Sequence, residues 1–147
     1  MNKSLILVAG MSILGLASLS APAEAAPTSC SLWTLHGTLA WGGPPGVNAN
    51  SGQPFANSGM ESYDGKGNLK YYELQSDGYL KQKFVGTGTY TITSNCIATV
   101  IYDGDIANPY TYFVAPDGSA YYYNNNLGLG RVSGGRVDRI STALLIK

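Results

Sequence analysis

Residues 110–123 read YTYFVAPDGSAYYY, two short aromatic runs joined by Pro116, Asp117 and Gly118. Aromatic and β-branched residues favour strands. Pro, Asp and Gly in succession favour a tight turn in which glycine adopts a positive φ. The stretch therefore predicts a β-hairpin with a three-residue loop, in which Ala115 lies opposite Ser119.

The same register predicts which aromatic side chains face the core. Alternation puts Tyr121 and Tyr123 on the face of Phe113, and leaves Tyr112 and Tyr122 on the opposite face. Because phenylalanine has no polar tip that tolerates water, we expect the Phe113 face to lie inside. A change of one residue in the loop would reverse the two faces. The expected inward set is Tyr90, Phe113, Tyr121 and Tyr123.

Further strand and turn signals recur along the chain. The expected strands are 32–40, 57–63, 69–74, 79–85, 88–93, 97–103, 110–115, 119–123 and 137–146. Strands at this spacing with hairpin-type links favour an antiparallel up-and-down meander. Closure into a barrel removes exposed edges, whereas a sandwich leaves four. We expect an all-β fold of about eight strands closed into a small calycin-like barrel, with a sandwich as the alternative.

Residues 1–25 have the three parts of a secretory signal peptide: a positive start, an apolar run and small residues before the cleavage site. The apolar run is about 15 residues, shorter than the roughly 20 that a spanning helix needs. We expect cleavage after Ala25, which leaves one domain of residues 26–147, periplasmic or secreted, without a further membrane span. A retained N-terminal anchor is the alternative.

Charge balance argues against two classes of partner. The chain has nine basic and nine acidic residues, with no run of like charge. A protein that follows a nucleic-acid backbone needs a basic surface to displace counterions. We therefore expect no nucleic-acid partner and no binding to an anionic membrane surface.

Cys30 and Cys96 are the two cysteines of the chain. An even pair in an oxidising compartment predicts a disulfide, which would close a loop of about 65 residues and add about 4 kcal/mol of stability in the chain-entropy model. A free or intermolecular thiol is one alternative. Lipid modification of Cys30 is another, although residues 27–29 lack the pattern of a lipoprotein signal.

No set of catalytic or metal-binding residues stands out. His36 is the single histidine, and neither a Gly-x-Ser-x-Gly elbow nor a His-Glu-x-x-His motif is present. One histidine and two bridged cysteines are too few for a zinc site, and Lys66 occupies a ligand position in the calcium-like stretch 64–68. We expect no metal and no cofactor, and we assign no catalytic residue.

Aromatic content is the informative feature. The chain holds eleven tyrosines, two tryptophans and three phenylalanines. Tyrosine combines a large apolar body with a hydrogen-bonding tip. Inside a barrel, such side chains suit a small aromatic or amphipathic ligand; outside, they suit stacking on sugar rings. Tyrosine is also simply a good strand residue, so both interpretations stay open.

Three segments resemble a group of small exported bacterial proteins: 63–68 (YDGKGN), 86–96 (GTGTYTITSNC) and 133–136 (SGGR). In that group a DGKGN hairpin precedes a GTYT…C strand pair, and a Ser-Gly-x-x-Arg segment lies near the end. The resemblance covers about residues 32–140. It implies a barrel akin to the lipocalin and allene oxide cyclase folds, in a group most of whose members have no assigned function.

Three functions follow as hypotheses. The first is an exported barrel that binds a small hydrophobic or aromatic molecule, with Tyr90, Phe113, Tyr121 and Tyr123 as its contacts. The second is a cyclase or isomerase whose apolar barrel shapes a reactive substrate. The third is an envelope interaction protein that uses aromatic strand faces.

Overall fold

The computed structural model describes residues 29–43, 45–48, 51–78, 80–124 and 134–147. Within them it contains one short 3-10 helix and strands that all pair antiparallel. The elements are η1 Leu32–Leu35, β1 Gly37–Gly42, β2 Gly46–Val47, β3 Pro54–Tyr63, β4 Asn68–Asp77, β5 Leu80–Ile92, β6 Ile97–Tyr102, β7 Tyr110–Val114, β8 Ala120–Asn124 and β9 Gly134–Ser141. The all-β prediction is confirmed.

Strand β1 closes the sheet into a barrel. It pairs with β9 on one side and with β3 on the other, while β3 to β9 follow one another as an up-and-down meander. The short β2 pairs with the start of β3 and lies outside this closed set of eight strands. The closed barrel is therefore confirmed, and the sandwich alternative is wrong.

Several expected strand boundaries differ from the structure. The first expected strand begins with η1, so that β1 starts only at Gly37. The expected strands 79–85 and 88–93 form one continuous strand, β5. Gly86 lies between them and allows close packing, because a Cβ there would lie 2.7 Å from the Tyr71 ring.

Helix η1 closes one end of the barrel, and we call it the plug. Leu35 of η1 is fully buried, the Tyr90 hydroxyl donates to the carbonyl of Leu32 at 2.9 Å, and Arg139 donates to the carbonyl of Thr34 at 2.6 Å. The Cys30–Cys96 disulfide ties the plug to the turn between β5 and β6. The predicted disulfide is thus confirmed.

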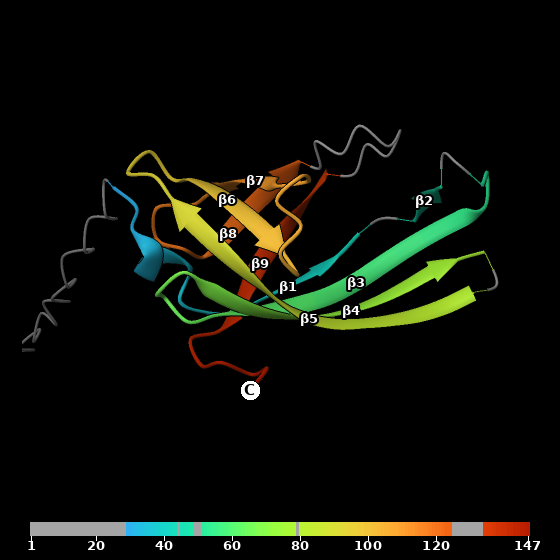
Figure 1. The fold of residues 1–147 in the computed structure, drawn as a ribbon, viewed down its shortest axis with the longest axis horizontal. Coiled ribbons are helices and arrows are strands. Elements are labelled where there is room, and N and C mark those ends of the chain that lie inside the picture. Colours follow the sequence, from blue (N-terminus) through green and yellow to red (C-terminus); the bar gives the residue numbers. More distant parts are fainter. Residues whose placement is uncertain (1–28, 44, 49–50, 79, 125–133) are drawn as a thin grey trace, which may run out of the picture.

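Strands β3, β4 and β5 continue past the barrel as a three-stranded arm, seen on the right of Figure 1. They have 10, 10 and 13 residues, against 5 or 6 in β6, β7 and β8. We call residues 54–60, 72–77 and 80–85 the arm, whose base still pairs with β1 through residues 58–60. Its inner face is continuous with the inside of the barrel, because strand pairing is regular through both.

The C-terminal segment after β9 covers the outside of β1 and β3. The Thr38 hydroxyl donates to the carbonyl of Ala143 at 2.7 Å and accepts from the N–H of Leu145 at 3.0 Å. The Ser62 hydroxyl accepts from the N–H of Ile146 at 3.0 Å. The last expected strand, 137–146, therefore ends at Ser141, and the residues beyond it form a cover.

In the part of the chain that the structure describes, no helix has the length and apolar character needed to cross a membrane. The expected signal peptide lies outside the described residues, as do residues 125–133 between β8 and β9.

Candidate functional site

The hairpin between β7 and β8 has a longer loop than predicted. The N–H of Gly118 donates to Ala115 at 2.7 Å, and the N–H of Ala115 donates to Ala120 at 2.9 Å. Ser119 therefore belongs to the loop, and its N–H donates to the Asp117 carboxylate at 2.9 Å. The predicted pair Ala115–Ser119 is wrong by one residue.

That one residue reverses the faces of β7 relative to the prediction, while Tyr121 and Tyr123 of β8 face inward as predicted. Phe113 lies opposite Tyr122, and both point outward with exposed fractions of 53% and 54%. Tyr112, expected outside, is buried beside Tyr121 with their rings stacked at 4.2 Å. The prediction that Phe113 faces the interior is therefore wrong, and with it the place of Phe113 in an inner ligand site.

A buried carboxyl lies at the centre of the barrel. Glu61 of β3 is 2% exposed. Its Oε2 accepts hydrogen bonds from the hydroxyls of Tyr63 and Tyr121. Its Oε1 accepts from Tyr102 and, at 3.5 Å, from Tyr112, and the Tyr102 and Tyr112 hydroxyls also bond each other. We call these five residues the Glu61 cluster.

Burial sets the ionisation of this cluster. It raises the pKa of Glu61 above the ordinary value for a glutamate, against the opposite effect of the four hydroxyl donors. Burial, followed by the charge of Glu61, raises the pKa of Tyr63, Tyr102 and Tyr121 well above the ordinary value for tyrosine. Burial therefore favours the neutral, protonated forms of Glu61 and of these tyrosines over their charged forms.

Strand alternation positions Glu61, but the sequence analysis did not identify it. Tyr63 and Glu61 lie two residues apart on β3, so both face inward. The usable signal was an alternation in residues 59–63 that places a carboxyl next to a core tyrosine. It was weak, because a lone glutamate in a strand is normally exposed.

Aromatic side chains continue above the Glu61 cluster, at the end of the barrel away from η1. They are Trp41, Tyr71, Tyr110 and Tyr123, each partly buried against the core. Tyr71 and Tyr110 each meet the Tyr102 ring edge to face at 5.1 Å, and Tyr123 lies 6.2 Å from the Tyr112 ring. We call these four residues the mouth aromatics.

The mouth is acidic as well as aromatic. Glu73 lies on the inner face of the arm, and its Oε1 accepts from the Asn57 amide at 3.1 Å. Burial, followed by the charges of Glu61 and Glu73, raises the pKa of Tyr123. Among the described residues, no lysine or arginine lies on the inner face at this end.

The four residues predicted to contact a ligand lie at different positions along the barrel. Tyr90 is buried next to the plug, and its ring meets that of Tyr63 at 5.1 Å. Tyr121 belongs to the Glu61 cluster. Only Tyr123 reaches the mouth, while Phe113 lies on the outer wall.

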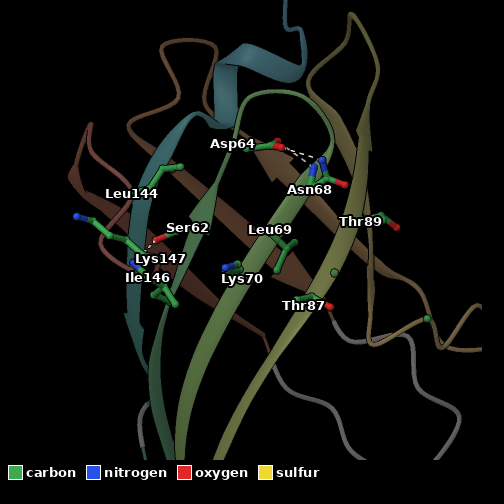
Figure 2. A pocket seen from close by; sticks show the side chains of 12 residues that line it. Ser62, Asp64, Asn68, Leu69, Lys70, Thr87, Thr89, Leu144, Ile146 and Lys147 are labelled. Atoms are coloured by element: carbon green, nitrogen blue, oxygen red, sulfur yellow. Dashed lines mark hydrogen bonds between the residues drawn. The ribbon is translucent and has the colours of Figure 1, made fainter.

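Two hollows lie on the outside of the barrel wall. One, of about 450 Å³, opens between the C-terminal segment and strands β4 and β5, with Lys70 and Thr87 among its lining side chains (Figure 2). The other, of about 310 Å³, lies beside Phe113, Tyr122 and Arg136. Neither includes a residue of the Glu61 cluster or a mouth aromatic.

His36 lies apart from both the cluster and the mouth. Its ring stacks on Trp33 at 4.0 Å, at the end of the barrel that η1 closes. Within the described ranges, no group of three histidine, cysteine, aspartate or glutamate side chains is placed to hold a metal ion.

Comparisons with known proteins return no match: no family model, no curated protein and no solved structure is similar to this chain.

Proposed function

We propose that this protein is an exported barrel that binds a small aromatic molecule at its mouth. The observation that supports it best is the set of mouth aromatics, which are only partly buried although they face the inside of a closed barrel. Side chains of this type bind flat apolar molecules through their ring faces. The inner face of the arm extends this surface beyond the barrel.

The charge of the mouth favours a ligand that carries an amine. Glu73 places a carboxyl on the inner face of the arm, and no basic residue lies among the described positions of that face. Electron-rich tyrosine and tryptophan rings attract cations by about 0.5–2 kcal/mol each. A neutral aromatic molecule gains only the stacking, and an aromatic acid is repelled.

Export is part of this proposal. The Cys30–Cys96 disulfide is of the kind that persists in oxidising compartments, and residues 1–25 have the pattern of a signal peptide. N-terminal sequencing of protein recovered from outside the cytoplasm should find Ala26 first. A chain that still begins at Met1 would contradict export by cleavage.

Trp41 provides the test of binding. Only Trp33 and Trp41 are present, so a Trp33→Phe variant leaves Trp41 as the single tryptophan, which is excited selectively at a wavelength where tyrosine does not absorb. We would titrate it with 2-phenylethylamine, benzyl alcohol and 3-phenylpropanoate. The expected order of affinity is amine, then alcohol, then acid.

Two variants localise the binding. Tyr123→Ala should weaken binding of all three probes, and Glu73→Gln should remove only the preference for the amine. Phe113→Ala, on the outer wall, is the matched control and should leave every titration unchanged. An unaltered Trp41 signal with all three probes, or equal effects of the Tyr123 and Phe113 variants, would refute the proposed site.

A cyclase or isomerase is the second candidate. The observation that favours it is Glu61, since a buried carboxyl with a raised pKa is suited to act as a general acid or base. The three probes have no double bond that an acid or base can shift, so this test uses an aromatic β,γ-unsaturated ketone. Its conversion to the conjugated isomer, lost in Glu61→Gln while Trp41 still reports binding, would favour catalysis. Recovery of the ketone unchanged would favour binding without catalysis.

A further inference from the structure

Strand β5 has a free edge along the arm. It pairs with β4 over its residues 80–89, but with β6 only from Gly88 onward. Among the described residues, no strand pairs with the other side of residues 80–87. Figure 1 shows this part of β5 at the margin of the arm.

Asp103 marks where the edge ends and shows which groups point outward. The carbonyl of Thr87 accepts from the N–H of Asp103 at 2.8 Å, and the N–H of Thr87 donates to its carboxylate at 3.1 Å. Alternate residues of a strand direct their N–H and C=O groups to the same edge. The backbone groups of Lys81, Lys83 and Val85 therefore point, like those of Thr87, away from β4 and toward the free edge of the sheet.

We propose that this edge binds an extended acidic segment of another protein as an added antiparallel strand. Strand addition gains affinity from main-chain hydrogen bonds and specificity from alternate side chains. Lys81, Lys83 and Val85 supply both, since all three are exposed on the outer face of the arm. Val85 alone has an exposed fraction of 59%.

The two lysines select the charge of the partner. Neither Lys81 nor Lys83 has an ion pair within the described part of the chain. Lys83 instead lies over the Tyr72 ring, 5.6 Å from its centre. The neighbouring outer-face positions of β4 are Tyr72, Leu74 and Ser76, so an acidic residue is missing on that side too.

A second copy of this chain fits the edge poorly in the register that pairs the lysines. Antiparallel self-pairing centred on Lys83 would set the two Lys83 side chains opposite each other, and like charges directly opposite destabilise a sheet. Edge lysines commonly prevent pairing between identical chains. Carboxylates on the incoming strand remove that repulsion, so the same lysines that reject a copy accept an acidic segment.

The register defines the sequence that fits. An antiparallel partner meets Val85 first, then Lys83, then Lys81, which requires an apolar residue followed by two acidic residues at alternate positions. The intervening side chains point to the side of Phe84 and Gln82. A heptapeptide of sequence Ser-Val-Thr-Glu-Thr-Glu-Ser satisfies this pattern.

The experiment measures binding of this peptide, labelled with a fluorophore, to the full-length mature protein by anisotropy. The double variant Lys81→Glu/Lys83→Glu should weaken binding at least tenfold, and added salt should weaken binding to the parent protein. Lys70→Glu, a charge reversal on the outer wall of the barrel, is the control and should change affinity little. A peptide with lysines in place of both glutamates should not bind.

Two further changes separate strand addition from simple charge attraction. Methylation of the peptide N–H at the glutamate opposite Lys83 should abolish binding, whereas methylation at the following threonine, whose N–H points away, should not. Val85→Pro removes one outward N–H of β5 and should weaken binding of the unmodified peptide, with a circular dichroism spectrum like the parent's. Equal effects of the two methylations would overturn the proposal in favour of a charged surface.

Other outcomes also count against it. A concentration-dependent dimer that Val85→Pro abolishes would assign the edge to a second copy instead. Binding of the peptide should be unchanged in Tyr123→Ala and unaffected by 2-phenylethylamine, because the edge and the mouth are separate sites. Competition between the two ligands would refute the placement of the peptide on the edge.

Discussion

The Tyr121 hydroxyl donates a hydrogen bond to Oε2 of Glu61, although 60 residues separate them. The contact joins β8 to β3 across the inside of the barrel, and Tyr102 joins β6 to the other carboxyl oxygen. A buried carboxyl is costly unless its oxygens are satisfied. In this cluster the tyrosine hydroxyls donate to the carboxyl oxygens. The carboxyl therefore depends on the hydroxyls as donors, and the hydroxyls depend on the carboxyl as their acceptor.

Replacement of Glu61 should therefore destabilise the fold strongly. Glu61→Leu removes the acceptor of buried tyrosine hydroxyls, each of which costs about 1–3 kcal/mol when unsatisfied. We expect a total loss of at least about 3 kcal/mol in the free energy of unfolding, measured with urea. Glu73→Leu, at a partly exposed carboxyl, is the control and should cost far less. Equal losses would contradict the structural role of the cluster.

Stability should depend on the protonation of Glu61. Its pKa is raised in the folded protein, whereas an unfolded glutamate has a pKa of about 4.3. The folded state binds the proton more tightly, so this contribution is complete below about pH 4.3 and is lost as the pH rises through the folded pKa. Relative to Glu61→Gln, the parent should become less stable over that range in urea unfolding. If the free energy of unfolding of the parent instead rose with pH relative to that of Glu61→Gln, the pKa of Glu61 would be lowered by folding, and the prediction would be wrong.

Alkaline unfolding should be abrupt. The pKa values of Tyr63, Tyr102, Tyr112 and Tyr121 are raised well above the ordinary value in the folded state, while unfolded tyrosines ionise near pH 10. Stability from these groups is complete below about pH 10 and is lost above it. Ultraviolet titration should show the buried tyrosines ionising together with the loss of structure, not before it.

Loss of the disulfide should loosen the plug. The bond joins residues 66 positions apart, and a loop of this length contributes about 4 kcal/mol in the chain-entropy model. The double variant Cys30→Ala/Cys96→Ala should lose about that amount in denaturant unfolding. Hydrogen exchange should rise first in η1. Unchanged exchange there would mean that Leu35 and the contacts of Tyr90 and Arg139 hold the plug alone.

The register of the β7–β8 hairpin gives a matched pair of variants. Tyr112→Ala removes a ring that is 2% exposed and should cost about 3–5 kcal/mol, as for other buried aromatic residues. Phe113→Ala removes a ring that is 53% exposed and should cost less than about 1 kcal/mol. Equilibrium unfolding of the two variants decides between the registers, since a three-residue loop would reverse the order.

Local chemistry made most of the architecture predictable. The turn at residues 64–68 forms where expected, with the Asp64 carboxylate accepting from the N–H groups of Lys66 and Asn68. Short strands between such turns have few ways to pair other than with their neighbours, which determines an antiparallel meander. The pairing of Cys30 with Cys96 followed from the even number of cysteines together with the expected export.

Tertiary structure decided what the sequence left open. Whether Ser119 joins the loop or the strand depends on the pairing of β7 with β8 and on the N–H of Arg139, which donates to the Ser119 carbonyl. Glu61 and Tyr121 meet only because the barrel closes through β1, which turns β3 and β8 toward one common interior. Alternation determines which residues lie on one side of a strand, but only closure of the sheet determines which side is inside and which residues meet across it.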